Sequence, residues 1–460
     1  MKNCAVILAA GEGTRMKTSK PKAMCQVLFK PMLDWVISAV EKAGVEDICV
    51  VTGFNAEYIE NHLNGKYCTV RQTERKGTGH AVMQAMDFIK EHSDANVFVL
   101  NGDAPFIDFE TLNQALSYHT ERGNDVTVIS ACVSEPTGYG RIIRNCDGDI
   151  DAIVEENDAD EKTKLINEVN SGAYCFKAQT LAESLLSITP TNAKGEYYIT
   201  DTISIILSSN GKAGVYNAKN EKTVLGANNR RQLNMLNEYA RMEIIENLMD
   251  QGVDIPCTDG IMIGPDCFVG RDTQILPNTI LCGTVKIGEN SVIGPNSYVL
   301  DSEIGDNVSF NNSQIRKAKI LNNASIGPFT QIRPDSVIGN GVHLGNFVEV
   351  KNSVIDSDTS VSHLTYVGDS DVGKNVNFGC GVVTVNFNGK TKNRTVIKDR
   401  AFIGCNTNLI APVSVGENSY TAAGSTITDD VPDNTLAIAR ERQVNKDGWV
   451  KKKQPYRKKV

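Results

Sequence analysis

A glycine-rich segment that contains two basic residues follows the first apolar run of the chain. Gly11-Glu12-Gly13-Thr14-Arg15 comes directly after the run Val6 to Ala10, and Lys22 stands shortly downstream. Glycines let backbone amides approach phosphate oxygens closely, and the two basic side chains bring positive charge to the same loop. The segment lacks the Gly-Lys-Ser/Thr of a P-loop and the third glycine of a dinucleotide fingerprint. It therefore predicts a phosphate-binding loop of another class.

A carboxylate follows another apolar run. The run Val97 to Leu100 leads into Asn101-Gly102-Asp103, and a strand there would place Asp103 at its carboxyl end. Proteins commonly hold Mg²⁺ with one or two carboxylates together with substrate phosphates. Asp103 is therefore a candidate metal ligand, although a turn residue that caps the next helix would also explain it.

Two basic residues and a histidine stand out in the second half. Arg333 follows Ile332, Lys351 follows Val350, and the two basic residues are 18 positions apart. Like charges about 5 Å apart on adjacent strands destabilise each other unless an anion bridges them, so the pair predicts a phosphate site. Two separately solvated side chains are the alternative. His363 lies just beyond, and imidazole can accept a proton near neutral pH, although a structural role is also open.

The first half has the pattern of an α/β domain. Expected strands at 6–10, 48–52 and 97–100 alternate with expected helices at 33–43 and 81–90. This alternation indicates a parallel sheet with helices on both faces and with ligands at the carboxyl ends of its strands. A connecting helix is expected at 231–251, where Asn228 or Asn229 can cap the start and Gly252 can end it.

The second half has an aliphatic residue at every sixth position over long stretches. The two longest runs are Ile263, Val269, Ile275, Leu281, Ile287, Ile293 and Val299, and Ile320, Ile326, Ile332, Ile338, Leu344 and Val350. An even period keeps side chains on one face of an extended chain, and no helix has this period. Glycine and asparagine between these positions suit left-handed corners, so the repeat predicts a prism-shaped parallel β-helix with about 18 residues per coil. The interruption from Thr384 to Val396 predicts a loop that leaves the prism.

Composition narrows the classes of protein. Net charge is −8, hydrophobic residues make up 41% of the chain, and no apolar stretch approaches the roughly 18 residues of a membrane helix. We expect a soluble, cytoplasmic protein. The 12 cysteines include no CxxC pair, which argues against a metal cluster or a disulfide framework. The tail Arg440 to Val460 has a net charge of +7, and the rest of the chain has a net charge of −15. Because the acidic remainder would repel nucleic acid, this distribution favours a small polyanionic ligand.

Several strings taken in order carry a family resemblance. They are LAAGEGTRM with PK downstream, QTERKGTGHA, NGDAPF, GYGRI, IVEENDA, VNSGAYCF and GANNRRQL, followed by the six-residue repeats. The chain resembles, over essentially its whole length, the bacterial bifunctional N-acetylglucosamine-1-phosphate uridylyltransferases / glucosamine-1-phosphate N-acetyltransferases. The resemblance implies a Rossmann-like α/β nucleotidyltransferase domain at 1–230, a helical linker at 231–251, and a left-handed parallel β-helix with N-acetyltransferase activity and a basic tail at 252–460.

The resemblance also implies a two-step synthesis of UDP-N-acetylglucosamine, a precursor of peptidoglycan and lipopolysaccharide-type envelope polymers. Glucosamine 1-phosphate would first be acetylated by acetyl-CoA in the C-terminal domain. The N-acetylglucosamine 1-phosphate would then receive a uridylyl group from UTP in the N-terminal domain, with release of pyrophosphate. Mg²⁺ as cofactor, a homotrimer with the acetylation site between neighbouring prisms, and no nucleic acid or membrane insertion are implied as well.

Residues of the nucleotidyltransferase site are assigned by the same resemblance. Arg15 and Lys22 would offset the charge on phosphorus, and Asp103 and Asn228 would ligate Mg²⁺. The residues implied to bind UTP and UDP-N-acetylglucosamine are Leu8, Ala9, Ala10, Gly11, Lys22, Gln72, Gly77, Thr78, Asn101, Gly102, Asp103, Gly140, Glu155, Asn170 and Asn228. Asn101 stands where the family leads us to expect tyrosine.

Residues of the acetyltransferase site follow in the same way. His363 would be the general base and Glu349 would orient it. Arg333, Lys351, Tyr366 and Asn377 would bind glucosamine 1-phosphate, and Cys380, Asn386, Phe387, Cys405, Ala423 and Arg440 would bind acetyl-CoA. Phe387, Cys405 and Cys380 stand in place of the expected tyrosine, serine and alanine. Because a thiol is a weaker hydrogen-bond donor than a hydroxyl, we expect a functional but thiol-sensitive acetyltransferase.

Two other interpretations remain. A non-catalytic regulatory subunit, similar to the nucleotidyltransferase-plus-hexapeptide subunits of the translation initiation exchange factor, would keep the architecture without catalysis. The presence of Lys22, Asp103, Asn228 and His363 argues against it. A bifunctional sugar-phosphate nucleotidyltransferase with another base or sugar is the second alternative, because glycine-rich loops and metal pairs are common to that class.

Overall fold

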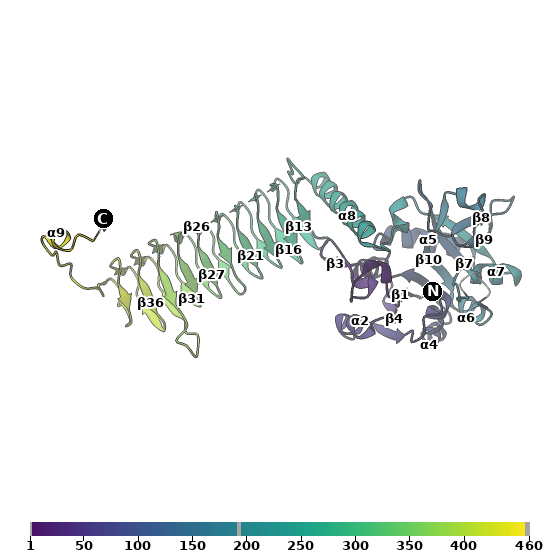
Figure 1. The fold of residues 1–460 in the computed structure, drawn as a ribbon, viewed down its shortest axis with the longest axis horizontal. Coiled ribbons are helices and arrows are strands. Elements are labelled where there is room, and N and C mark those ends of the chain that lie inside the picture. Colours follow the sequence, from purple (N-terminus) through teal and green to yellow (C-terminus); the bar gives the residue numbers. More distant parts are fainter. Residues whose placement is uncertain (1, 191–194, 456–460) are drawn as a thin grey trace. The chain divides into compact units, whose positions relative to one another are not determined.

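The computed structural model describes residues 2–190 and 195–455. The chain divides into two compact units, Met1–Met242 and Glu243–Val460. Figure 1 shows the first unit as a sheet covered by helices and the second as a stack of short strands. The last residues of the predicted basic tail, 456–460, lie outside the described residues.

A nine-stranded sheet forms the centre of the first unit. Its main path runs β11-β7-β10-β6-β1-β4-β5. The strands of this path are β1 (Asn3–Leu8), β4 (Asp47–Thr52), β5 (Cys68–Arg71), β6 (Asn96–Asn101), β7 (Val126–Cys132), β10 (Glu168–Lys177) and β11 (Ala213–Asn217). The central strand β1 is parallel to both β4 and β6, and Leu8 pairs with Asn101. Strands β1, β4 and β6 confirm the three strands predicted there.

The sheet is mixed, whereas the sequence pattern predicted a parallel one. Strand β10 runs antiparallel to both β6 and β7. After β7 the chain forms the antiparallel hairpin β8 (Arg141–Arg144) and β9 (Ile150–Val154), and β10 then pairs with β8. A parallel strand would have required a crossover connection at this point, and the chain has a hairpin instead. Register shifts between Asn170 and Ala173, which makes a bulge in β10.

Helices cover both faces of this sheet, as predicted. They are α1 (Met32–Lys42), α2 (Ala56–Leu63), α3 (Thr78–Met83), α4 (Met86–Glu91), α5 (Phe109–Arg122), α6 (Ala178–Leu185) and α7 (Asp201–Ser208). Alternate residues of β1 enter two different hydrophobic clusters: Ala5 and Ile7 belong to one, Cys4 and Val6 to the other. The single helix predicted at 81–90 is divided into α3 and α4.

The long helix α8 (Arg230–Asp250) lies where the sequence predicted a helix at 231–251. Asn229 caps it, because its Oδ1 accepts a hydrogen bond from the backbone N of Gln232 at 3.0 Å. Gly252 follows its end with φ of +93°, a left-handed conformation that suits glycine. Among the described residues, no helix is long and apolar enough to cross a membrane.

The second unit is a left-handed β-helix built from three parallel sheets of 10, 9 and 10 strands. Paired strands are three apart in chain order, except that β38 (Tyr420–Thr421) pairs with β40 (Leu436–Ala437). The aliphatic residues of the six-residue repeat are buried in one continuous core. Asparagines at the predicted corners are left-handed, with φ of +56° at Asn290, +52° at Asn296 and +55° at Asn375. The predicted prism and the left-handed asparagines at its corners are therefore confirmed.

Two of these sheets carry the residues of interest. The first contains β24 (Gln331–Ile332), β27 (Glu349–Lys351), β30 (Tyr366–Gly368), β33 (Val383–Val385) and β36 (Asn408–Ile410). The second contains β26 (His343–Asn346), β29 (Ser360–His363), β32 (Asn377–Phe378), β35 (Phe402–Ile403) and β38 (Tyr420–Thr421). The other strands of the prism, between Met262 and Ala437, are similarly short.

One long loop leaves the prism where the sequence predicted an interruption. It connects β33 to β34 (Thr395–Ile397), so residues 386–394 form the excursion and the flanking residues remain in strands. An antiparallel bridge joins Phe387 to Lys392 within it. Figure 1 shows the loop projecting from the prism near β31 (Ser370–Val372).

Candidate active sites

A pocket of about 260 Å³ opens at the carboxyl ends of the central strands of the first unit. Eight residues that the sequence assigned to nucleotide, sugar or metal line it: Lys22, Thr78, Asn101, Asp103, Gly140, Glu155, Asn170 and Asn228. They come from segments that are far apart in the chain, including the ends of β6, β9 and β10 and the start of α8. The pocket lies where an α/β sheet usually binds its ligand.

Lys22, Asp103 and Asn228 meet inside this pocket. The Lys22 ammonium donates a hydrogen bond to Asn228 Oδ1 at 2.7 Å and forms an ion pair with Asp103 Oδ2. Two oxygens from distant segments therefore converge on one cationic group. Oxygen ligands of this kind suit Mg²⁺, which combines a few protein oxygens with water and substrate phosphates. These two oxygen donors fit the predicted Mg²⁺. Among the described residues, no group of three or more His, Cys, Asp or Glu side chains could hold a metal ion.

Gln232 holds the backbone of Asn228 and was missed by the sequence analysis. Its Oε1 accepts the backbone N–H of Asn228 at 2.7 Å, while its own backbone N–H donates to the Asn229 side chain. This reciprocal arrangement is close to a capping box. The spacing Asn229-x-x-Gln232 in the sequence would have been the signal.

The bulge of β10 forms one wall of the pocket. Asn170 donates from Nδ2 to the hydroxyl of Tyr174 at 2.7 Å and accepts from the backbone N of Gly172 at 3.0 Å. Burial raises the pKa of the Tyr174 hydroxyl. A Cβ atom on Gly172, which has φ of +74°, would lie 2.0 Å from Nδ2 of Asn101. Asn101, the residue that replaces the expected tyrosine, is therefore packed directly against this glycine.

The remaining predicted residues of the first site lie beside the pocket. Gln72 donates from Nε2 to the carbonyl of Gly77 at 3.1 Å. This hydrogen bond lies within the loop that connects β5 to α3. Gly77 has φ of +103°, and a Cβ atom there would lie 2.5 Å from the Tyr197 carbonyl oxygen. Arg15 is exposed on the short helix Thr14–Met16. Leu8, Ala9, Ala10, Gly11 and Gly102 belong to or follow the ends of β1 and β6.

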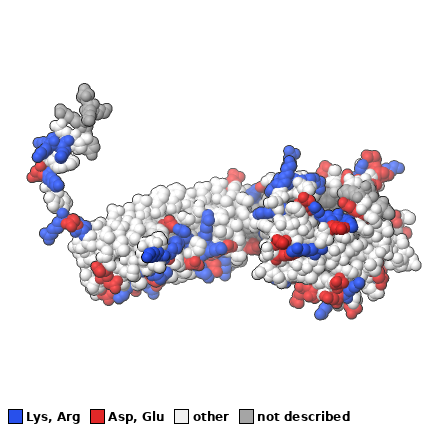
Figure 2. Space-filling view, turned by 60° about the horizontal axis from the view of Figure 1, so that its bottom comes forward, with Lys and Arg blue, Asp and Glu red and all other residues white. Residues whose placement is uncertain are grey.

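In the prism, the predicted stacking of Arg333 and Lys351 is confirmed. Ile332 pairs with Val350, and the backbone N of Arg333 donates to the Val350 carbonyl at 2.8 Å. Arg333 also donates from Nη1 to Glu349 Oε1 at 2.8 Å. Figure 2 shows several Lys and Arg side chains on one part of the prism surface, with Asp and Glu side chains near them.

A third basic residue joins this pair and was missed by the sequence analysis. The Lys392 ammonium lies beside that of Lys351, and it is the leading cause that lowers the pKa of Lys351, followed by partial burial and Arg333. Lys392 is on the loop that leaves the prism. Three cations held this close favour an anionic ligand among them.

His363 is exposed at the end of β29, and its partner is Asn346. The His363 Nδ1 atom lies 2.7 Å from Asn346 Oδ1, and the two residues pair in register on adjacent strands. The sequence expectation gave the orienting role to Glu349. Within one chain, Glu349 contacts Arg333 instead, because these two residues share one sheet whereas His363 lies in the next.

The residues assigned to acetyl-CoA follow the same edge of the prism as His363. Successive backbone hydrogen bonds run from Gly381 N to the His363 carbonyl at 3.4 Å, from Asn406 N to the Cys380 carbonyl at 2.7 Å, and from Gly424 N to the Cys405 carbonyl at 2.8 Å. Cys380, Cys405 and Ala423 therefore lie at equivalent corners of successive coils. The Arg440 Cδ atom is 3.9 Å from a Cβ built on Gly424, which brings Arg440 to the same edge.

The other assigned residues lie nearby. Asn386 is buried at the start of the loop and donates from Nδ2 to the Tyr366 hydroxyl at 3.3 Å. Phe387 follows it and is exposed. Asn377 is exposed on β32.

Comparison with known proteins gives matches over both units. Residues 4–222 match the nucleotidyl transferase family, and residues 266–301, 317–352 and 394–429 match the bacterial transferase hexapeptide (six repeats) family. Three similar proteins, each described as "Bifunctional protein GlmU", come from Acetivibrio thermocellus, Thermoanaerobacter pseudethanolicus and Caldanaerobacter subterraneus subsp. tengcongensis. Their identities are 46%, 47% and 48%; the matches cover 98%, 97% and 98% of this chain and 97%, 97% and 98% of those proteins.

Proposed function

The chain belongs to the family of the bifunctional GlmU proteins, and we propose that it makes UDP-N-acetylglucosamine in two steps. The prism acetylates glucosamine 1-phosphate with acetyl-CoA, and the first unit then transfers a uridylyl group from UTP to the acetylated product. The observation that carries this proposal is the Lys22, Asp103 and Asn228 cluster in one unit together with the His363 edge in the other.

Uridylyl transfer needs positioning and charge rather than a protein nucleophile. An oxygen of the sugar phosphate attacks the α-phosphorus of UTP in line, and pyrophosphate leaves. Lys22 and Arg15 offset the negative charge that gathers around phosphorus. Mg²⁺, for which Asp103 and Asn228 are the proposed protein ligands, supplies Lewis-acid charge when bound. The bulge of β10, with Asn170 and the neighbouring Gly140, binds the sugar end.

Acetyl transfer needs a base and an anion site. Asn346 accepts the Nδ1 proton of His363, which leaves Nε2 free to take a proton from the 2-amine of the sugar. The amine nitrogen forms a bond to the thioester carbon, the carbon–sulfur bond breaks, and coenzyme A leaves as its thiol. Arg333, Lys351 and Lys392 bind the phosphate of the sugar.

We further propose a homotrimer that works in the cytoplasm, where UTP and acetyl-CoA are available. An exposed apolar row beside His363 supports the assembly: Phe329, Phe347 and Leu364 are 57%, 54% and 59% exposed, and the first two rings stack at 5.3 Å. Apolar surface of this kind favours burial against another subunit. Light scattering on the purified protein tests the trimer, and a monomer at micromolar concentration would contradict it.

The two reactions are tested separately on the purified protein. Release of coenzyme A thiol from acetyl-CoA should depend on glucosamine 1-phosphate, and release of pyrophosphate should require UTP and N-acetylglucosamine 1-phosphate. Pyrophosphate release with dTTP or with another sugar phosphate instead would favour a nucleotidyltransferase of different specificity. Absence of both products would favour the regulatory subunit.

A further inference from the structure

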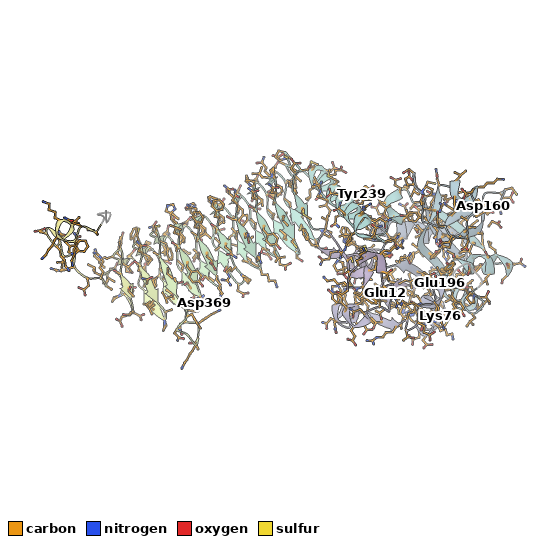
Figure 3. All side chains as sticks on the ribbon, in the orientation of Figure 1. Glu12, Lys76, Asp160, Glu196, Tyr239 and Asp369 are labelled. Carbon is orange, nitrogen blue, oxygen red and sulfur yellow. The ribbon has the colours of Figure 1, made fainter. Side chains whose placement is uncertain are left out.

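The buried residue Asp369 forms hydrogen bonds with both ends of the loop that leaves the prism. At the start of the loop, Asn386 donates a hydrogen bond from Nδ2 to Asp369 Oδ2. At its end, the backbone N of Thr395 donates to the carbonyl oxygen of Asp369 at 3.1 Å. Figure 3 labels Asp369 next to the base of the projecting loop.

The surroundings of Asp369 keep its carboxyl group ionised. The residue is only 3% exposed, and burial by itself raises the pKa of a carboxyl group. The amides of Asn352 and Asn386 and the ammonium groups of Lys351 and Lys392 outweigh that effect and lower the pKa of Asp369. The Asn352 bond, from Nδ2 to Asp369 Oδ1, is 2.5 Å long.

An ionised carboxylate determines which way a neighbouring amide points. A carboxylate accepts hydrogen bonds and donates none, so the NH₂ group of Asn386 must face Asp369. The second hydrogen of this NH₂ group is directed to the Tyr366 hydroxyl, 3.3 Å away. The amide of Asn386 therefore has one orientation, and its oxygen is turned away from Asp369.

We propose that Asp369 is a positioning residue for acetyl transfer, which sets the orientation of the Asn386 amide in the proposed acetyl-CoA site. This inference rests on the proposed function, because Asn386 is one of the residues that the family resemblance assigns to acetyl-CoA. An uncharged amide in place of Asp369 can both donate and accept, so it permits the Asn386 side chain to turn over. Catalysis then loses a correctly aimed amide although the side-chain volume at residue 369 is unchanged.

Asp371 offers a matched control at the same base of the loop. It holds the loop through Arg394, which donates from Nε to Asp371 Oδ2 at 2.8 Å and from Nη1 to the Asn352 carbonyl at 3.2 Å. Asp371 pairs with Arg394 rather than with Asn386. The Asp371→Asn variant therefore loosens the loop without changing the charge that faces the Asn386 amide.

The test compares Asp369→Asn with Asp371→Asn in the full chain. Steady-state acetyl transfer gives kcat and separate KM values for acetyl-CoA and glucosamine 1-phosphate, and trypsin cleavage within the loop at Lys390 reports loosening. We expect Asp369→Asn to lower kcat roughly tenfold or more, as for loss of a hydrogen bond to a charged group. We expect Asp371→Asn to retain kcat within about twofold even where cleavage increases.

A second variant keeps the test decisive. Asn386→Ala removes the amide that Asp369 orients, so adding Asp369→Asn to Asn386→Ala should lower kcat little further. Equal losses of kcat in Asp369→Asn and Asp371→Asn, or an unchanged kcat in Asp369→Asn, would overturn the inference. Circular dichroism and thermal melting of the same samples report whether the prism is folded. Wild-type protein that fails to acetylate glucosamine 1-phosphate would overturn the proposed function instead.

Discussion

Asn346 Oδ1 lies 2.7 Å from His363 Nδ1, and the two residues occupy paired positions on adjacent strands of the prism. An amide oxygen can only accept a hydrogen bond, so the contact selects the imidazole form with its proton on Nδ1. The Nε2 atom then keeps the lone pair that a general base requires. We therefore propose that Asn346, one coil away, orients His363.

Replacing Asn346 should therefore impair acetyl transfer. We expect Asn346→Ala to lower kcat about tenfold, because the imidazole loses the partner that selects its form, while KM for acetyl-CoA changes little. Glu349→Gln, by contrast, should mainly raise KM for glucosamine 1-phosphate, because Glu349 holds Arg333. A larger fall in kcat for Glu349→Gln than for Asn346→Ala would restore Glu349 as the orienting residue.

The two activities should be lost independently. Asp103→Ala should lower uridylyl transfer by roughly a hundredfold or more and leave acetyl transfer unchanged, because it removes a proposed ligand of Mg²⁺. His363→Ala should do the reverse, at a cost of roughly 10²–10⁴-fold to acetyl transfer. Pyrophosphate and thiol release from one preparation measure both. Loss of both activities in either variant would contradict two separate sites.

Gln232 should tune the metal requirement of uridylyl transfer. Removal of divalent cations with EDTA should abolish this activity and spare acetyl transfer. We expect Gln232→Leu to raise the Mg²⁺ concentration for half-maximal rate roughly tenfold, because the Asn228 backbone loses its acceptor. Gln232→Glu keeps an acceptor oxygen and is the matched control. The same Mg²⁺ dependence in both variants would show that the hydrogen bond does not matter for the metal.

His119 should make the first unit lose stability as the pH falls. Burial, with help from the Lys177 ammonium, lowers the pKa of His119 to about 4 from 6.5. Between these values the unfolded chain binds the proton and the folded chain does not, so the free energy of unfolding decreases as pH drops from about 6.5 toward 4. The effect is on the order of 2–3 kcal/mol over that range. Urea unfolding of wild type and His119→Leu from pH 4.5 to 7 measures this effect. If the free energy of unfolding changes equally with pH in both proteins, His119 is not its cause.

Cys405 should make acetyl transfer sensitive to alkylation. It is exposed at a corner of the prism, one coil beyond Cys380, on the edge assigned to acetyl-CoA. We expect iodoacetamide to inhibit acetyl transfer by more than about tenfold through the added bulk, and Cys405→Ser to be resistant. The exposed Cys68, Cys132 and Cys146 lie in the first unit, so uridylyl transfer serves as the internal comparison. If alkylation of Cys405 leaves acetyl transfer untouched, its place at the acetyl-CoA site is wrong.

Much of the architecture was predictable because it depends on short-range regularity. A six-residue period places Ile332 and Val350 inside the prism independently of the packing of distant segments. The same period stacks Arg333 above Lys351 on adjacent coils. Corner residues such as Asn290 are recognisable because few residues accept positive φ. The direction of β10 was not predictable in the same way, since strand direction depends on how the chain returns to the sheet.

The sequence by itself determined the prism, its loop, the α/β character of the first unit and the family. Only the tertiary structure decided which side chains meet. Lys22 contacts Asn228 across 206 positions of sequence, Asn346 rather than Glu349 contacts His363, and Asp369 faces Asn386. The physical reason is that periodicity is a property of neighbours along the chain. A hydrogen-bond partner is chosen by distance and direction in space, which depend on how every intervening residue packs.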